Sequence, residues 1–223
     1  MFTAILTSNG ARFVGKDEAG NYYNATTEPQ FLEASQWAVG LIEAGYEKKA
    51  EEGSNWDWFV SAFHDAQVAM TFADQSKVGT WADMTDDWGF VLQPKPSVND
   101  PYRTYVNDNI IVMPATFDTE EAEKIAFAFD LYTDPTPGYE DDANAWKENY
   151  YPNFRDSRAV DETLEFLYNS SETKVINDYE RFIYGTDGGA DYIWGVYALD
   201  ASPAERIEEI SVKWASLIDD ANR

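Results

Sequence analysis

Apolar side chains recur at intervals of three and four residues in six segments of the chain, the spacing of helices that bury one face. The residues expected on these faces are Phe31, Ala34, Ala38, Leu41 and Ile42; Phe59, Ala62, Phe63 and Ala66; Ala122, Ile125, Ala126, Phe129 and Tyr132; Val160, Leu164, Leu167 and Tyr168; Ile176, Tyr179, Phe182 and Ile183; and Ile207, Ile210, Trp214, Leu217 and Ala221. Helices therefore dominate the predicted architecture.

Polar residues and glycines mark where several of these helices should begin and end. The expected first caps are Thr27, Asn55, Asp118 and Ser202, and the expected stops are Gly45 and Gly185. A capping box is predicted at the last helix, where Pro203 and Glu205 follow Ser202. Thr27 with Gln30 and Asp118 with Glu121 have the same spacing.

Short alternating or continuous apolar runs predict a few strands. RFVGKDEAGNYYN, residues 12–24, alternates on both sides of DEAG and predicts a hairpin. VAMTFA (68–73) and DDWGFVLQPKP (86–96) also alternate, and NIIVMP (109–114) is continuous, as in a strand buried on both faces. The segments 133–146 and 185–195 are expected to be loops. Helices alternating with few strands predict an α/β fold, a small mixed sheet flanked by helices.

Composition narrows the functional classes. The chain has 223 residues, with 41 acidic and 16 basic side chains and a net charge of −25. Such a negative field disfavours nucleic acids and anionic membrane surfaces as partners. The chain contains no cysteine, which excludes disulfides, thiolate metal sites and cysteine nucleophiles. No apolar run is long enough to cross a bilayer, and the segment MFTAILTSNGARF lacks the features of a signal peptide.

The only histidine, His64, lies in the aromatic-rich stretch NWDWFVSAFHDAQVAM, residues 55–70. It follows Phe63 at the edge of a predicted apolar face, and no Asp, Ser or Cys stands at a spacing that suggests a catalytic triad. We therefore expect a surface or capping histidine within a helix–strand unit. No catalytic residue, metal site or cofactor is predicted.

Four stretches in order resemble the extracellular solute-binding proteins of ABC importers, in particular the maltose-binding-protein-like family. They are FHDAQVAM, WGFVLQPKP, NIIVMPATFDTEEAEKIAFAFDLYTD and SPAERIEEISVKWASLIDDAN. The resemblance implies a periplasmic-binding-protein type II fold of which residues 1–223 are the C-terminal portion, mostly the second lobe. The first lobe is absent, and residues 104–150 resemble the segment that packs on it.

The same resemblance implies capture of a ligand, most simply a carbohydrate or oligosaccharide, and delivery to the permease subunits of the importer. The full-length parent would be extracytoplasmic, anchored to the cell surface as a lipoprotein. In such proteins the segment after the first of these stretches and the loop before the last helix face the cleft. The ligand-binding residues implied are Asp74, Gln75, Ser76 and Trp81, with Asp191, Tyr192 and Trp194.

Aromatic rings suit sugar ligands, because the C–H faces of a sugar pack against a flat ring. The competing interpretation is that these tryptophans are core residues, since Trp is highly buried on average. The two interpretations weigh equally for Trp81, whereas glycines and a polar loop beside Trp194 favour ligand contact. Trp37 and Trp214 lie in helical patterns and are expected to pack.

Two other functional classes remain open. A glycoside hydrolase would use paired carboxylates, which the acidic composition allows. A calcium-dependent structural module would use the oxygen-rich segments YEDDANAW (139–146) or TDGGADY (186–192), although neither has EF-hand spacing. Loss of the first lobe would also uncover the strand containing Ile110 to Met113, so we expect the chain to form a homodimer.

Overall fold

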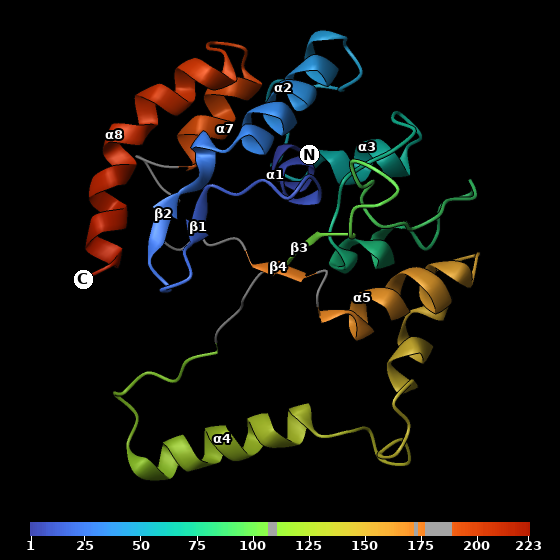
Figure 1. Ribbon diagram of the computed structural model, residues 1–223. Coiled ribbons are helices and arrows are strands. Elements are labelled where there is room, and N and C mark those ends of the chain that lie inside the picture. Colours follow the sequence, from blue (N-terminus) through green and yellow to red (C-terminus); the bar gives the residue numbers. More distant parts are fainter. Residues whose placement is uncertain (107–110, 172–173, 177–188) are drawn as a thin grey trace.

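Helices make up half of the residues that the structure describes, and two small sheets accompany them there. The computed structural model describes residues 1–106, 111–171, 174–176 and 189–223 (Figure 1). The elements in chain order are α1 (Phe2–Ser8), β1 (Val14–Lys16), β2 (Tyr22–Asn24), η1 (Ala25–Thr27), α2 (Pro29–Glu43), α3 (Trp58–His64), η2 (Gln75–Trp81), β3 (Thr104–Val106), α4 (Thr119–Thr133), η3 (Ala145–Asn149), η4 (Tyr151–Asn153), η5 (Ala159–Leu164), α5 (Glu165–Asn169), β4 (Lys174–Ile176), α7 (Gly189–Tyr197) and α8 (Pro203–Ala221). This composition agrees with the predicted α/β class.

The predicted hairpin is confirmed by β1 and β2, which pair antiparallel with Gly15 opposite Tyr23. Asp17 stabilises its turn, because its Oδ1 accepts hydrogen bonds from the backbone N–H groups of Ala19 and Asn21 at 2.9 and 2.8 Å. The second sheet is a parallel pair, β3 with β4, and it joins segments about 70 residues apart in sequence.

The main core lies between α1, α2, α7, α8 and the hairpin. Its aromatic centre is Phe13, whose ring centroid lies 5.0 Å from that of Phe31 and 5.6 Å from that of Trp214. Burial is confirmed for the predicted residues Phe31, Ala34, Ala38, Ile42, Ile210 and Trp214. Two details of the prediction are wrong: Leu217 is partly exposed while Ile218 faces the core, and Trp37 is 57% exposed instead of packed.

A second packed group contains the stretch around His64. The ring of Phe63 on α3 lies edge-on to Trp81, with centroids 5.0 Å apart, and Trp81 lies 5.5 Å from Trp88. Trp81 also donates a hydrogen bond from Nε1 to the backbone oxygen of Val60 at 3.0 Å. The helix of this stretch therefore packs against other residues, as its apolar spacing predicts, whereas the strand expected directly after it does not form.

Three predicted strands do not form where the chain is described. Residues 68–73, 86–96 and 111–114 are irregular chain without a ladder partner; residues 109 and 110 lie outside the described part. The side chains of Met70 and Ile111 are 84% and 73% exposed. A strand needs a neighbour to satisfy its backbone groups, so alternation of apolar and polar residues without a partner leaves irregular chain.

Several of the predicted helix caps and stops are confirmed. Asp118 Oδ1 accepts from the backbone N–H of Glu121 at 2.9 Å, and the Ser202–Glu205 capping box is present at α8. Gly45 has a positive φ of 73° just after α2, as a helix stop requires. The predicted caps Thr27 and Asn55 are wrong, because α2 begins after Glu28 and α3 after Asp57.

The segment 176–195 departs from its prediction at both described ends. Ile176 belongs to β4 and not to a helix, whereas the rest of the predicted helix, Tyr179, Phe182 and Ile183 with its stop at Gly185, lies outside the described residues. The predicted loop over 185–195 becomes helix α7 from Gly189 onward. Packing of Tyr192 and Val196 into the core accounts for this helix in spite of its glycines.

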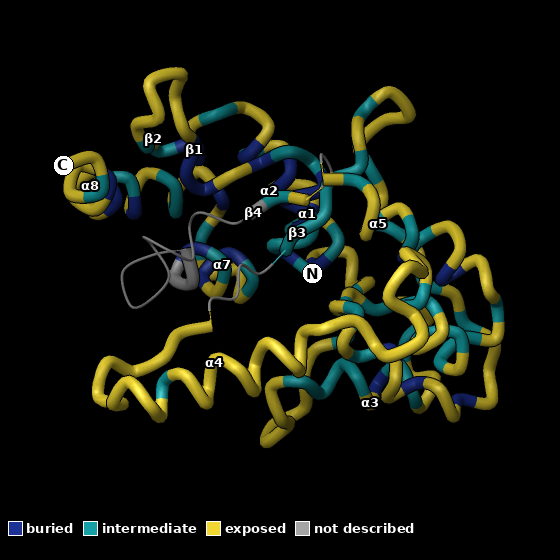
Figure 2. The backbone as a smooth tube through the Cα atoms, turned by 90° about the horizontal axis from the view of Figure 1, so that it is seen from below, coloured by how far each residue is buried: buried dark blue, intermediate teal, exposed yellow. Residues whose placement is uncertain are grey.

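Helix α4 stands away from both packed groups, and none of its residues is buried (Figure 1, Figure 2). The predicted buried stripe of Ala122, Ile125, Ala126, Phe129 and Tyr132 is therefore wrong in this structure, because no element of the described residues covers the helix. Phe127 and Leu131 are also exposed. Among the described helices, none combines the length and the apolar character needed to span a bilayer.

Candidate functional site

The residues implied as ligand-binding fall into two separate groups. Asp74, Gln75, Ser76 and Trp81 belong to η2, next to α3, whereas Asp191, Tyr192 and Trp194 belong to α7, which packs on α8. Figure 1 and Figure 2 both place α3 and α7 in different parts of the molecule. The structure therefore does not bring the seven residues into one site.

The η2 residues have local structural partners. Asp74 caps the turn, since its Oδ1 accepts from the backbone N–H of Ser76 at 2.9 Å. Gln75 donates from Nε2 to the hydroxyl oxygens of Tyr150 and Tyr168 at 2.9 and 3.3 Å. Trp81 is only 2% exposed, so its ring faces are covered by protein. For Trp81 the structure favours the core interpretation.

On α7, the periodicity of the helix decides which ring is available. Tyr192 and Val196 are one turn apart and fully buried against the main core. Tyr192 also donates its hydroxyl hydrogen to Ser35 Oγ at 2.8 Å. Trp194 consequently points away from the core and is 66% exposed. Asp191 lies in α7, but its side chain is outside the described part.

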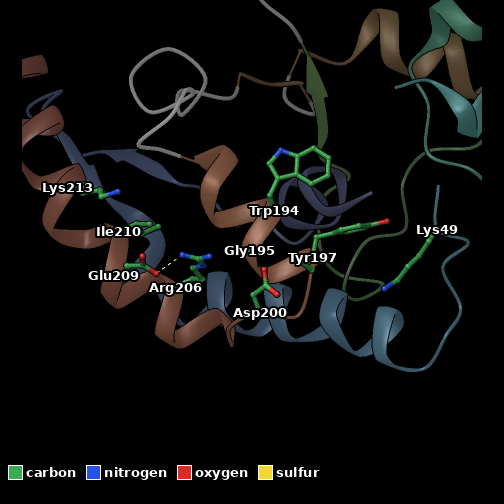
Figure 3. A pocket seen from close by; sticks show the side chains of 10 residues that line it. Lys49, Trp194, Gly195, Tyr197, Asp200, Arg206, Glu209, Ile210 and Lys213 are labelled. Carbon is green, nitrogen blue, oxygen red and sulfur yellow. Dashed lines mark hydrogen bonds and ion pairs between the residues drawn. The ribbon is translucent and has the colours of Figure 1, made fainter. Parts of the chain in front are cut away.

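Trp194 stands at the edge of a cavity of about 540 Å³ between α7, α8 and the segment after α2 (Figure 3). The lining residues are Lys49, Trp194, Gly195, Tyr197, Ala198, Asp200, Arg206, Glu209, Ile210 and Lys213. The rings of Trp194 and Tyr197 are nearly perpendicular, at 84°, with centroids 6.0 Å apart. The cavity thus combines an exposed aromatic face with charged hydrogen-bonding groups, as small-molecule sites do.

Two sets of contacts organise the charges around this cavity. Arg206 donates from Nη1 to Glu209 Oε2 at 2.6 Å, one turn along α8. Tyr197 makes a side-chain hydrogen bond to Glu47, and burial followed by the charge of Glu47 raises the pKa of the Tyr197 hydroxyl. Tyr197 therefore stays a neutral hydrogen-bond donor at physiological pH.

Trp194 is a predicted ligand-binding residue, whereas no pattern in the sequence singles out the polar residues of this cavity. Arg206 and Glu209 lie off the apolar face of the last predicted helix, and Lys49 lies in a stretch without periodicity. One signal was available: Trp194 and Tyr197 are three residues apart, so a helix over this segment places both rings on neighbouring positions. Assigning the segment to a loop hid that relation.

A second cavity, of about 490 Å³, lies in the segment 134–149. Glu140, Asp141 and Asp142 line it together with Tyr139 and Trp146. This is the YEDDANAW stretch considered for calcium. Within the described residues, however, no three His, Cys, Asp or Glu side chains converge where they could hold a metal ion.

His64 lies between two carboxylates on the surface. Its Nδ1 is 3.0 Å from Asp65 Oδ1, and its Nε2 is 3.1 Å from Asp83 Oδ1. Hydrogen bonds to Asp65 and then to Asp83 raise the pKa of the imidazole above its usual value of 6.5. Both ring nitrogens are occupied, which leaves neither available as a general base in this arrangement.

Comparison with known proteins supplies no further assignment: no protein-family model, curated protein or solved structure matches the chain.

Proposed function

We propose that this chain belongs to the ligand-capture component of an ABC importer and binds a carbohydrate at the α7–α8 cavity. The observation that carries the proposal is the orientation of Trp194. Its indole is two-thirds exposed at the rim of the cavity, while the neighbouring Tyr192 and Val196 fix α7 from the other side. An exposed, rigidly held ring beside hydrogen-bonding groups is the arrangement that a sugar face requires.

The finer architecture is part of the same proposal. In a type II binding protein this chain would supply mainly the second lobe, and residues 104–150 would pack on the first. Support comes from α4 and residues 111–114, whose large apolar side chains are exposed throughout. Apolar surface of this extent is rarely left bare in a monomeric protein.

Delivery to permease subunits and an extracytoplasmic location of the parent follow from this role and are proposed with it. Closure of two lobes around a ligand moves protein and makes no bond, so the function needs no catalytic group or cofactor. The proposed ligand-binding residue is Trp194, with Tyr197 as its neighbour. Trp81 and Tyr192 are assigned to the core instead.

The test is isothermal titration of the full 223-residue chain with a panel of oligosaccharides, comparing the unmodified chain, Trp194→Ala and Trp37→Ala. Trp37 is a matched control, because it is also exposed but lies on α2 and does not line the cavity. Loss of one stacking ring at the low end of the known range, about 1 kcal/mol, raises the Kd roughly fivefold for Trp194→Ala.

The control Trp37→Ala should bind like the unmodified chain. Equal affinity of all three proteins for a bound oligosaccharide would overturn the assignment of the site, and absence of binding would overturn the proposal. Asp200 and Glu209 also line the cavity. Appearance of reducing ends during incubation would therefore replace the proposal with the glycoside-hydrolase alternative.

A further inference from the structure

Among the described lining residues of the α7–α8 cavity, basic side chains outnumber acidic ones, unlike in the whole chain. Over the whole chain, 41 acidic side chains outnumber 16 basic ones. Among the described residues that line it, three are cationic, Lys49, Arg206 and Lys213, and two are carboxylates, Asp200 and Glu209, of which Glu209 is paired with Arg206. Positive groups gathered in a concave site create a local field that attracts anions even on an acidic protein. The wall is therefore suited to a negatively charged ligand.

Arg206 is held in place by two features of its surroundings. Its guanidinium lies directly against the backbone of Gly195, where a Cβ would come within 2.3 Å of Nε. Glu209 binds only its Nη1. The Nε–H is buried and has no hydrogen-bond partner among the described residues. Because Nε is covered by the protein, the donors that remain for a ligand are those of the terminal amino groups, of which Nη1 already binds Glu209.

A carboxylate is the group that matches this donor set. It accepts two parallel hydrogen bonds from a guanidinium, and such charge-assisted pairs are stronger than bonds between neutral groups. Lys49 is exposed on the opposite side of the cavity and adds a second positive charge (Figure 3). Trp194 offers its ring face at the rim. The cavity therefore combines one anion-binding wall with one apolar platform.

We propose that the ligand of this cavity is an acidic saccharide, a uronate whose carboxylate binds Arg206 while its sugar ring packs on Trp194. This inference rests on the proposed carbohydrate-binding function and specifies its substrate class. It also assigns a role to Gly195: any side chain there would displace the guanidinium from the wall of the cavity.

The experiment compares each acidic ligand with its own uncharged form. Oligomers of galacturonate, mannuronate and glucuronate are titrated into the full chain by calorimetry, beside the corresponding methyl esters, which keep the ring and remove the charge. At least one free acid should bind about tenfold more tightly than its ester, as expected for a charged hydrogen-bond pair. The difference should shrink as salt is added.

Substitutions of the lining residues test which side chains cause the preference for the free acid over its ester. Arg206→Gln should bring the acid down to the affinity of its ester, and Lys49→Gln, which changes an exposed position outside any helix, should reduce the preference in part. Arg158→Gln is the control, because Arg158 is an exposed, ion-paired arginine that does not line the cavity. Circular dichroism establishes that each variant is folded.

The possible results distinguish failure of the acidic-ligand inference from failure of the proposed carbohydrate-binding function. Esters that bind as tightly as the acids, with both weakened by Trp194→Ala, would overturn the acidic ligand and retain carbohydrate binding. A preference for the acid that survives both Arg206→Gln and Lys49→Gln would also overturn it, because the charge would be recognised elsewhere. If neither acids nor esters bind, the inference and the proposed function fail together.

Discussion

Replacement of Tyr192 by phenylalanine tests whether α7 is anchored as the structure indicates. Tyr192 and Ser35 are both fully buried, and their side chains are joined by a hydrogen bond of 2.8 Å. Tyr192→Phe keeps the ring but leaves the Ser35 hydroxyl without its donor. An unsatisfied buried polar group costs about 1–3 kcal/mol. The melting temperature should fall by several degrees, since about 1 kcal/mol shifts it by roughly 2–4 °C in a chain of this size.

The double variant Tyr192→Phe with Ser35→Ala removes both partners and should recover most of the loss. Tyr23→Phe serves as a control, because its hydroxyl bonds Glu28 on the surface, and its effect should remain below about 0.5 kcal/mol. The measurements are thermal and urea unfolding. Unchanged stability together with weaker saccharide binding would refute the reasoning and make Tyr192 a ligand contact.

Alkaline unfolding offers an independent check on the same residue. Burial raises the pKa of Tyr192 to about 12, whereas an unfolded tyrosine titrates near 10. The folded state therefore favours the neutral hydroxyl. Its contribution to stability is complete below about pH 10 and is lost as the pH rises through 12. In Tyr192→Phe this part of the alkaline destabilisation should be missing; an identical profile would contradict the burial of the hydroxyl.

Three further predictions concern other parts of the chain. The only histidine, His64, should titrate in an NMR experiment with a midpoint above pH 6.5. Its contribution to the free energy of unfolding is complete below pH 6.5 and is lost as the pH rises through the folded-state midpoint. His64→Gln should lack this pH-dependent contribution. Ser202→Ala should cost about 1 kcal/mol in urea unfolding, with no loss expected if the capping box is absent. Light scattering over a dilution series should show association through the exposed apolar face of α4, reduced by charges at Phe127 and Leu131; a monomer at every concentration would contradict this.

The features that the sequence predicts correctly are those decided within a few residues. The caps at Asp118 and Ser202, the stop at Gly45 and the turn at Asp17 each depend on hydrogen bonds or backbone angles inside one short segment. The prediction of which residues α2 and α8 bury is also largely correct, because both helices are long and uninterrupted and keep their apolar residues on one side.

The failures concern partners that are distant in sequence. An apolar stripe predicts burial only if another element covers it, and for α4 no element in the described part of the chain does. Residues 68–73 alternate like a strand but have no strand beside them. The glycines before Trp194 favour a loop, yet contacts of Tyr192 and Val196 with the main core hold the segment as a helix. The α7–α8 cavity depends on this packing, so only its exposed ring could be inferred in advance.

The bare surface of α4 also implies that different parts of this chain open at very different rates. A helix of 15 residues with no buried side chain depends on its backbone bonds, its Asp118 cap and surface contacts such as the Lys124–Glu120 ion pair, and such a helix is marginal in water. Its amide hydrogens should exchange with solvent deuterium through local opening. The amide hydrogens of α8 around Trp214 should exchange only when the whole core unfolds. Limited proteolysis should therefore cleave the chain first around α4, unless a partner covers that helix.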